Sequence, residues 1–260
     1  MNDMLTPQEL SDSTITLGVY KTGKRTSQMF ISAMLAGMFV SLGYVGYLSI
    51  TGLFEDTKLG RVIGAVAFPV GLMLILIAGA ELFTSNVLIH MAFFKKKIGY
   101  YKVIKNLAVV WLGNLAGAVF FAILIYFSGL FASVTNKGLY DYAIHLAEYK
   151  TQLPMLEMFF RAILCNFLVS GTVYMTYASR SVPGKILCMI LPIWVFVLTS
   201  FEHVVANMFL LPMAYMLSDH LTLGQILYNL IPVTIGNIIG GLIVACSYYF
   251  LFQNKQEIQL

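Results

Sequence analysis

Long uncharged apolar stretches, separated by short segments that carry the charges, dominate the chain. A helix that crosses a bilayer needs roughly 20 predominantly apolar residues. Stretches that satisfy this length lie at residues 27–53, 62–94, 106–131, 156–179, 186–218 and 221–252. The pattern therefore predicts an all-α integral membrane protein with six transmembrane helices.

The second and fifth stretches are too long to be one simple span each. A continuous helix over residues 62–94 or 186–218 would be about 50 Å long, whereas the hydrocarbon core of a bilayer measures about 30 Å. Candidate helix breakers are Pro69, Gly71 and Gly79 in the first of them, and Pro192 and Pro212 in the second. We therefore expect helices 2 and 5 to be broken.

Composition agrees with a membrane protein and excludes several other classes. The chain is 59% hydrophobic and 11% charged, whereas soluble proteins carry about 25% charged residues. The net charge of +4 comes from basic residues between the apolar stretches, so no nucleic-acid partner is expected. The three cysteines lack metal-ligand spacing, so neither a metal site nor a cofactor is expected.

The basic residues are distributed unequally between the two sides of the predicted membrane. If the N-terminus is inside, that side holds Lys21, Lys24, Arg25, Lys95, Lys96, Lys97, Lys102, Lys105, Arg180, Lys185 and Lys255. The other side holds the smaller set of Lys58, Arg61, Lys137, Lys150 and Arg161. The positive-inside rule then places both termini in the cytoplasm, with residues 1–26 as a cytoplasmic N-terminal segment.

The two halves of the chain, residues 27–131 and 156–252, repeat a pattern. Matching pairs are Glu81 and Asn86 with Glu202 and Asn207, and Gly113-Asn114-x-x-Gly117 with Gly236-Asn237-x-x-Gly240. Three spans per half is an odd number, so the repeat must be inverted. Inverted repeats with broken helices place a substrate path at their interface. The sequence predicts a single channel domain over residues 1–260.

Glu81 and Glu202 are the only charged side chains of the second and fifth stretches. A carboxylate at bilayer depth is costly and is a functional candidate by default. These two could contact substrate, or they could anchor the broken backbone together with Asn86 and Asn207. The anchoring role is favoured.

Other polar side chains near the expected breaks have a functional and an ordinary interpretation. His203 could line a pore and exchange protons near neutral pH, or it could be a buried neutral histidine. Thr84 could donate to an anion or bond back within its helix. Lys150 could raise the local anion concentration or be a solvated loop residue. Apolar residues flanking the breaks could pack or could gate: Phe68, Leu72, Leu82, Phe83 and Phe196.

At these residues the chain resembles the formate/nitrite transporter family of formate, nitrite and hydrosulfide channels. The matching segments are GAELFTSN (79–86), WLGNLAGA (111–118), ILCNFLVS (163–170), FEHVVANMF (201–209) and IPVTIGNIIGG (231–241). The resemblance implies a homopentamer in the prokaryotic cytoplasmic membrane, in contact with lipid. Each aquaporin-like protomer would have its own pore, six spans, and interruptions in helices 2 and 5.

The resemblance also implies roles for individual residues. It places the pore histidine at His203, the pore threonine at Thr84, the vestibule lysine at Lys150 and the asparagine of helix 4 at Asn166. It assigns one constriction to Phe68, Leu72 and Phe196, and the other to Leu82, Phe83 and Val169.

The expected function is pH-dependent, proton-linked passage of a small weak-acid anion such as formate, nitrite or hydrosulfide. A proton from His203 or from vestibule water would neutralise the anion before it crosses the apolar rings. The alternative is an aquaporin-like channel for neutral solutes, although the Asn-Pro-Ala pair of that class is absent from the sequence. An enzyme is not expected, because only Glu202 could serve as an acid beside His203.

Overall fold

The computed structural model describes residues 4–253 apart from 133 and 135. Residues 1–3 and Lys255, which entered the predictions for the N-terminal segment and the charge distribution, lie outside the described residues. The elements are α1 (Pro7–Gly23), α2 (Thr26–Thr51), α3 (Thr57–Gly64), α4 (Pro69–Ala78), α5 (Phe83–Asn86), the short 3₁₀ helix η1 (Val87–Ile89), α6 (His90–Phe94), α7 (Tyr100–Ser128), α8 (Lys137–Gln152), α9 (Met155–Ala178), α10 (Val182–Leu198), α11 (Val204–Leu217) and α12 (Leu223–Phe252).

Local sequence signals explain where several helices begin. Thr6 and Glu9 form a capping box at the start of α1, and Thr222 and Gln225 form another at the start of α12. Each box satisfies backbone N–H groups that have no partner inside the helix. Ser181 caps α10 by accepting a hydrogen bond from the backbone N–H of Gly184.

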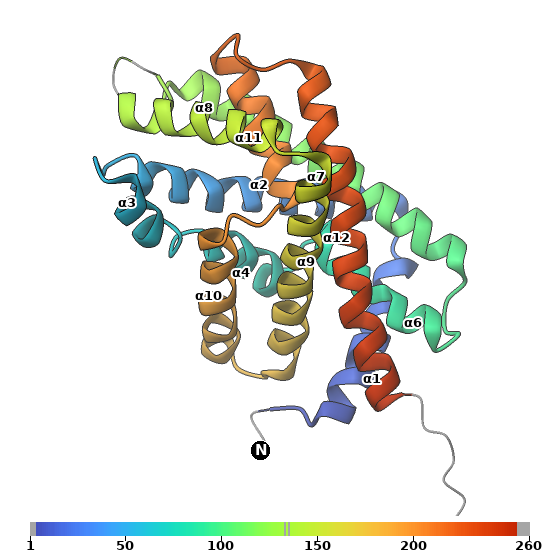
Figure 1. Ribbon diagram of the computed structural model, residues 1–260. Coiled ribbons are helices and arrows are strands. Elements are labelled where there is room, and N and C mark those ends of the chain that lie inside the picture. The colour runs from blue at the N-terminus through green and yellow to red at the C-terminus, as the bar shows by residue number, and fades with distance from the viewer. Residues whose placement is uncertain (1–3, 133, 135, 254–260) are drawn as a thin grey trace, which may run out of the picture.

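The long helices pack in two corresponding pairs, α2 with α7 and α9 with α12. A Cβ on Gly117 of α7 would lie 2.0 Å from the Met34 carbonyl oxygen of α2. A Cβ on Gly240 of α12 would lie 2.2 Å from the Ile163 carbonyl oxygen of α9. Only glycine permits such close approach between helix backbones. The Gly-Asn-x-x-Gly motifs therefore bring the helices of each pair together, and Figure 1 shows α9 and α12 side by side.

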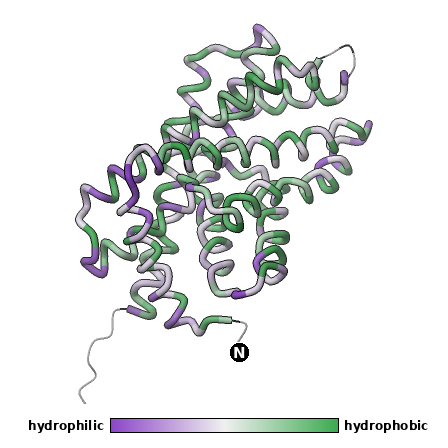
Figure 2. The backbone as a smooth tube through the Cα atoms, turned by 180° about the vertical axis from the view of Figure 1, so that it is seen from behind, coloured by the Kyte–Doolittle hydropathy of each residue, from purple (hydrophilic) through white to green (hydrophobic). Residues whose placement is uncertain are grey.

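Five helical stretches among the described residues are long and apolar enough to cross a membrane. They are Thr26–Thr51, Thr57–Ala78, Tyr100–Ser128, Met155–Ala178 and Leu223–Phe252. Shorter apolar helices cover Phe83–Phe94, Val182–Leu198 and Val204–Leu217. Hydrophobic residues run along most of the helices, while hydrophilic residues gather toward loops and helix ends (Figure 2). The all-helical, apolar architecture is as expected, and the count of six spans remains a prediction.

The chain leaves helical geometry between α4 and α5, at residues 79–82, and between α10 and α11, at residues 199–203. Each interruption contains a residue in the left-handed region, Gly79 with φ 91° and Ser200 with φ 54°. Each of these residues precedes the repeated glutamate by two positions. The two interruptions, here named the first break and the second break, therefore lie at matching places in the sequence repeat.

The proline-based expectation for the position of the second break is wrong. Pro192 lies inside α10 and Pro212 lies inside α11. Pro69 starts α4, where its missing N–H costs no hydrogen bond. Gly71 lies within α4 and does not interrupt it. Its role is close packing, since a Cβ there would lie 2.6 Å from the Phe39 carbonyl oxygen of α2. Left-handed residues, and the hydrogen bonds described below, fix the breaks instead.

Two further helices lie at opposite ends of the molecule, α1 at the bottom and α8 at the top of Figure 1. The N-terminus and the end of α12 lie at the same end as α1 (Figure 1). Lys150, expected in a loop, belongs to α8 and is only 6% exposed. The interpretation of Lys150 as a solvated loop lysine is therefore wrong.

Candidate functional site

Asn114 of α7 holds the first break by hydrogen bonds to a backbone carbonyl inside it and to the N–H that directly follows it. Its Oδ1 accepts from the N–H of Phe83 at 2.8 Å. Its Nδ2 donates to the carbonyl oxygens of Glu81 at 2.9 Å and Ala33 at 2.7 Å. Buried backbone groups outside a helix need such partners. The motif asparagine thus makes an interrupted backbone tolerable in an apolar interior.

Asn237 of α12 does the same for the second break. Its Oδ1 accepts from the N–H of Val204 at 2.9 Å. Its Nδ2 donates to the carbonyl oxygens of Glu202 at 2.9 Å and Ala162 at 2.8 Å. The Gly-Asn-x-x-Gly motif therefore has two uses in each half, because the glycines allow close packing and the asparagine fixes the break.

Glu81 lies in a cluster of charged and amide groups. Its Oε1 binds the Lys24 Nζ at 2.6 Å, and its Oε2 lies 3.3 Å from the Lys21 Nζ. Asn86 donates to the Glu81 Oε2 at 2.8 Å and to the Asn106 Oδ1 at 2.9 Å. Burial disfavours the charged form of Lys21, but Tyr177 and the Glu81 carboxylate outweigh it and raise the pKa of Lys21.

Glu202 lies in a corresponding cluster. Its Oε1 binds the Lys150 Nζ at 2.7 Å. Asn207 donates to the Glu202 Oε2 at 2.6 Å and to the Asn229 Oδ1 at 2.7 Å. Both glutamates are thus bound within the protein by a lysine and an asparagine, which favours the anchoring interpretation over direct substrate contact.

The first cluster has a second lysine, and this lysine leaves one atom differently bonded in the two clusters. The Asn86 Oδ1 accepts a hydrogen bond from the Lys21 Nζ at 2.6 Å. The corresponding Asn207 Oδ1 is buried, and no hydrogen bond to it is found among the described residues. Because a buried carbonyl oxygen without a donor is costly, the Asn207 Oδ1 is an available acceptor for water or for a hydroxyl group.

His203 joins the second break to the first. Its Nε2 lies 3.0 Å from the Thr84 Oγ1. Its Nδ1 accepts from the backbone N–H of Ala206 at 3.2 Å, which caps the start of α11. Because the Nδ1 accepts, the neutral ring carries its hydrogen on the Nε2. The ring therefore directs an N–H group toward Thr84.

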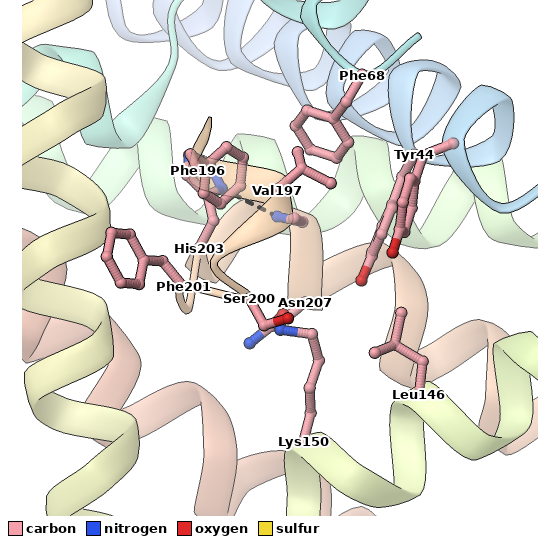
Figure 3. Close-up of a pocket in the computed structure, with 12 residues that line it drawn as sticks. Tyr44, Phe68, Leu146, Lys150, Phe196, Val197, Ser200, Phe201, His203 and Asn207 are labelled. Carbon is pink, nitrogen blue, oxygen red and sulfur yellow. Dashed lines mark hydrogen bonds between the residues drawn. The ribbon is translucent and has the colours of Figure 1, made fainter. Parts of the chain in front are cut away.

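A cavity of about 30 Å³ lies beside His203 and is lined by Lys150, Asn207, Ser200, Tyr44 and Tyr47, among others. We name it the Lys150 cavity. Figure 3 shows the Lys150 side chain rising from α8 toward Ser200 and Asn207, with Tyr44 facing it. The volume is enough for water, and the cavity contains both a cation and an unpaired amide oxygen.

A second cavity, of about 20 Å³, shares His203 with the first. We name it the apolar cavity, because its other walls include five of the residues assigned to constrictions: Phe68, Leu72, Leu82, Val169 and Phe196. The rings of Phe68 and Phe196 lie edge to face at 5.3 Å and line both cavities. The cavity with Lys150, Ser200 and Asn207 in its walls therefore adjoins the apolar cavity at His203.

Three residues assigned from the resemblance lie outside the walls of both cavities: Thr84, which contacts His203, Asn166 and Phe83. Asn166 donates to the carbonyl oxygens of Thr84 at 3.2 Å and Asn237 at 2.6 Å, and it is fully buried. Phe83 is buried, and its N–H is the group held by Asn114. The structure gives Asn166 and Phe83 a supporting position, and any contact of Thr84, Asn166 or Phe83 with substrate remains a prediction.

Lys21, Lys24, Asn106 and Asn229 are cluster residues that the sequence reasoning did not assign to the site. A signal for the asparagines was present, because Asn106 and Asn229 stand equally far before the two motif asparagines. The lysines were interpreted only as topology signals, since nothing local links α1 to the first break.

No group of three or more His, Cys, Asp or Glu side chains in the described part of the chain could hold a metal ion. The cysteines Cys165, Cys188 and Cys246 are free.

Comparison with known proteins agrees with this geometry. The family model described as Formate/nitrite transporter matches residues 8–251. The chain is 36% identical to the uncharacterized transporter YrhG of Bacillus subtilis, over 96% of this chain and 94% of that one. It is 34% identical to the formate channel FocA of Escherichia coli, over 98% and 97%.

A solved structure, a pentameric formate channel with formate bound, has a TM-score of 0.80 and 31% identity, covering 88% of this chain and 98% of that chain. The chain belongs to the formate/nitrite transporter family. It is an integral membrane protein, and its named relatives are channels and transporters.

Proposed function

We propose that the protein is a channel for small monovalent anions of weak acids, with formate as its first candidate substrate. The observation that carries the proposal is the position of His203, which lines both the Lys150 cavity and the apolar cavity. An anion can therefore be attracted at one side of the histidine and meets a non-polar wall at the other. The formate channels among the relatives support this choice of substrate.

Charge decides which form of the substrate can cross. Moving a bare anion into an apolar constriction costs several kcal/mol even after relaxation. Formate, nitrite and hydrosulfide avoid this cost when they bind one proton, because each then becomes a neutral acid. The acid releases the same proton on the far side, so the net result is transfer of one anion and one proton.

The hydrogen-bond geometry bears on where the proton comes from. Neutral His203 has one ring hydrogen, on the Nε2, and its Nδ1 already accepts from Ala206. Loss of the Nε2 hydrogen would leave an anionic ring, so we assign the proton to the outside solution, from which hydronium delivers it through water of the Lys150 cavity. In this scheme Lys150 attracts the anion, the Asn207 Oδ1 can accept the acid's O–H, and His203 and Thr84 receive it at the constriction.

The architecture that we propose follows the repeat. α1 and α8 lie at opposite ends of the molecule (Figure 1), and each supplies a lysine to the glutamate of one break. This arrangement is what an inverted 3+3 repeat produces. In it, α3 to α6 form broken helix 2, α10 and α11 form broken helix 5, and both termini face the cytoplasm of a prokaryote. The related pentameric channel supports a homopentamer in lipid.

A flux panel tests the proposal. Purified protein in liposomes is given formate, nitrite, hydrosulfide, acetate, chloride or glycerol at two pH values. We expect formate to pass faster at the lower pH, and chloride to be retained because it does not form a neutral acid in water. Glycerol flux equal to formate flux would support the aquaporin-like alternative instead. Equal chloride and formate flux would refute passage as the neutral acid.

A further inference from the structure

Arg61 of α3 contacts the second break from a distant part of the sequence. Its Nη2 donates to the carbonyl oxygen of Leu198 at 3.0 Å and to the Ser200 Oγ at 2.7 Å. Leu198 is the last residue of α10, and carbonyl groups at a helix end have no donor inside the helix. The guanidinium therefore gives the last carbonyl group of α10 a hydrogen-bond donor, and it also binds Ser200 at the start of the second break.

The identity of residue 200 points to a purpose for this contact. Gly79 occupies the matching place in the first break, with φ 91° and open space around its missing Cβ. Glycine adopts such a conformation freely, whereas serine does so at a cost. Ser200 has φ 54°, so its hydroxyl, which accepts from Arg61, offers a reason for a serine at a position better suited to glycine.

The helix that carries Arg61 is firmly attached to its neighbours. A Cβ on Gly60 or Gly64 would lie 2.7 Å from a carbonyl oxygen of α2, so α3 packs directly on that helix. The Trp194 Nε1 of α10 donates to the Val62 carbonyl oxygen of α3 at 2.9 Å. α3 is thus packed on α2 and bonded to α10. A helix fixed in this way can keep Arg61, and with it the second break, in place.

The break leads directly to the proposed selectivity residue. Ser200 lines the Lys150 cavity (Figure 3), and His203 ends the non-helical segment only three residues later. A shift of the segment would move the His203 ring relative to Thr84, since their contact spans the two breaks.

We infer that Arg61 and Ser200 form a positioning pair that fixes the second break, and through it His203, so that the constriction discriminates by size. The discrimination part of this inference rests on the proposed function, whereas the fixing of the break does not. Neither residue needs to contact substrate, so Arg61 acts through Ser200 and the α10 end.

Two readouts test the pair: hydrogen exchange of the amides at residues 199–203, and the ratio of acetate to formate flux in liposomes. The variants are Arg61→Gln, Arg61→Lys, Ser200→Ala and the double variant Arg61→Gln/Ser200→Ala. The matched control is Lys58→Gln, which removes an equal charge from the exposed face of the same helix.

We expect Arg61→Gln to accelerate exchange at 199–203 by about tenfold, the size of effect that a lost charge-assisted hydrogen bond produces. The acetate-to-formate ratio should rise with it, and Arg61→Lys should restore part of both. Ser200→Ala should move both readouts in the same direction. In the double variant, the exchange rate and the flux ratio should be no higher than in Arg61→Gln alone, because the two residues act through one contact. Lys58→Gln should change neither readout.

Unchanged exchange in Ser200→Ala would overturn the inference even if Arg61→Gln failed to fold. Where Arg61→Gln folds, fully additive effects in the double variant would overturn it as well. A similar rise in exchange and in the flux ratio in Lys58→Gln would mean that the loss of charge alone causes the effect, and this result would also overturn the inference. If the unmodified protein carried no formate, the proposed function would fall, while the exchange measurement would still decide whether Arg61 fixes the break.

Discussion

The Thr84 Oγ1 and the His203 Nε2 lie 3.0 Å apart, and this contact joins the two breaks in the interior of the protein. Thr84 follows the first break and His203 ends the second. The sequence repeat does not extend to these side chains, because the position matching His203 is Leu82 and the position matching Thr84 is Val205. A nearly symmetric scaffold therefore carries an asymmetric polar contact between its two breaks, where we place selectivity.

His203 has two separable tasks, and two substitutions distinguish them. His203→Phe removes the Nε2 contact and the α11 cap, so it should destabilise the protein by about 1 kcal/mol and abolish most pH-dependent formate flux. His203→Asn supplies a good capping oxygen, so it should keep the stability and still reduce flux. Thermal unfolding in detergent and liposome flux between about pH 5 and about pH 8 measure these effects. Wild-type flux in both variants across this range would contradict a role for the ring.

Lys150→Met should destabilise the protein far more than a surface lysine substitution does. It leaves the Glu202 carboxylate buried without its cation, and breaking a buried ion pair in this way costs about 3–5 kcal/mol. The double variant Lys150→Met/Glu202→Gln removes both charges and should recover most of the loss, while formate flux stays low without the attracting cation. Lys137→Met, at the exposed start of α8, is the control. Equal unfolding temperatures for Lys150→Met and Lys137→Met would refute the buried pair.

Three glycine substitutions should separate backbone conformation from helix packing. Gly79→Ala adds a Cβ in open space at φ 91°, so it should cost only about 1 kcal/mol. Gly117→Ala places a Cβ 2.0 Å from the Met34 carbonyl oxygen and must separate α2 from α7, so its cost should be larger, about 1–3 kcal/mol or more. Gly171→Ala in α9 meets nothing within 4 Å and should be neutral or stabilising. Thermal unfolding should give the lowest unfolding temperature for Gly117→Ala, then Gly79→Ala, then Gly171→Ala. Any other order would contradict the packing described.

The hydropathy pattern was sufficient to predict the helical membrane fold, because each long apolar stretch can be buried only as a helix in lipid. The glutamates of the repeated Glu-x4-Asn motif, expected to anchor the broken backbone, lie within the two non-helical segments. Proline gave the wrong positions, since Pro192 and Pro212 are accommodated inside helices. Asn114 and Asn237 are visible in the sequence as a repeated motif, but the breaks that they hold are on other helices, so the sequence did not reveal their role.

Prediction of the site from sequence was limited in the same way. His203 and Thr84 were named individually, but their contact joins segments that are far apart in sequence. Lys21 and Arg61 were missed because each belongs to a helix outside the repeated motifs and reaches a break through the fold alone. Charges at bilayer depth are recognisable in a sequence, whereas their partners require the structure.

The most direct test of the account follows the pH inside liposomes that contain the protein, after formate is added outside. If formate crosses as the neutral acid through the His203 constriction, the interior must acidify rapidly, because each acid molecule releases its proton on arrival. Acidification should be much faster than in empty liposomes, should be absent with chloride, and should slow strongly in His203→Phe. Formate entry without acidification, or acidification no faster than in empty liposomes, would contradict the account.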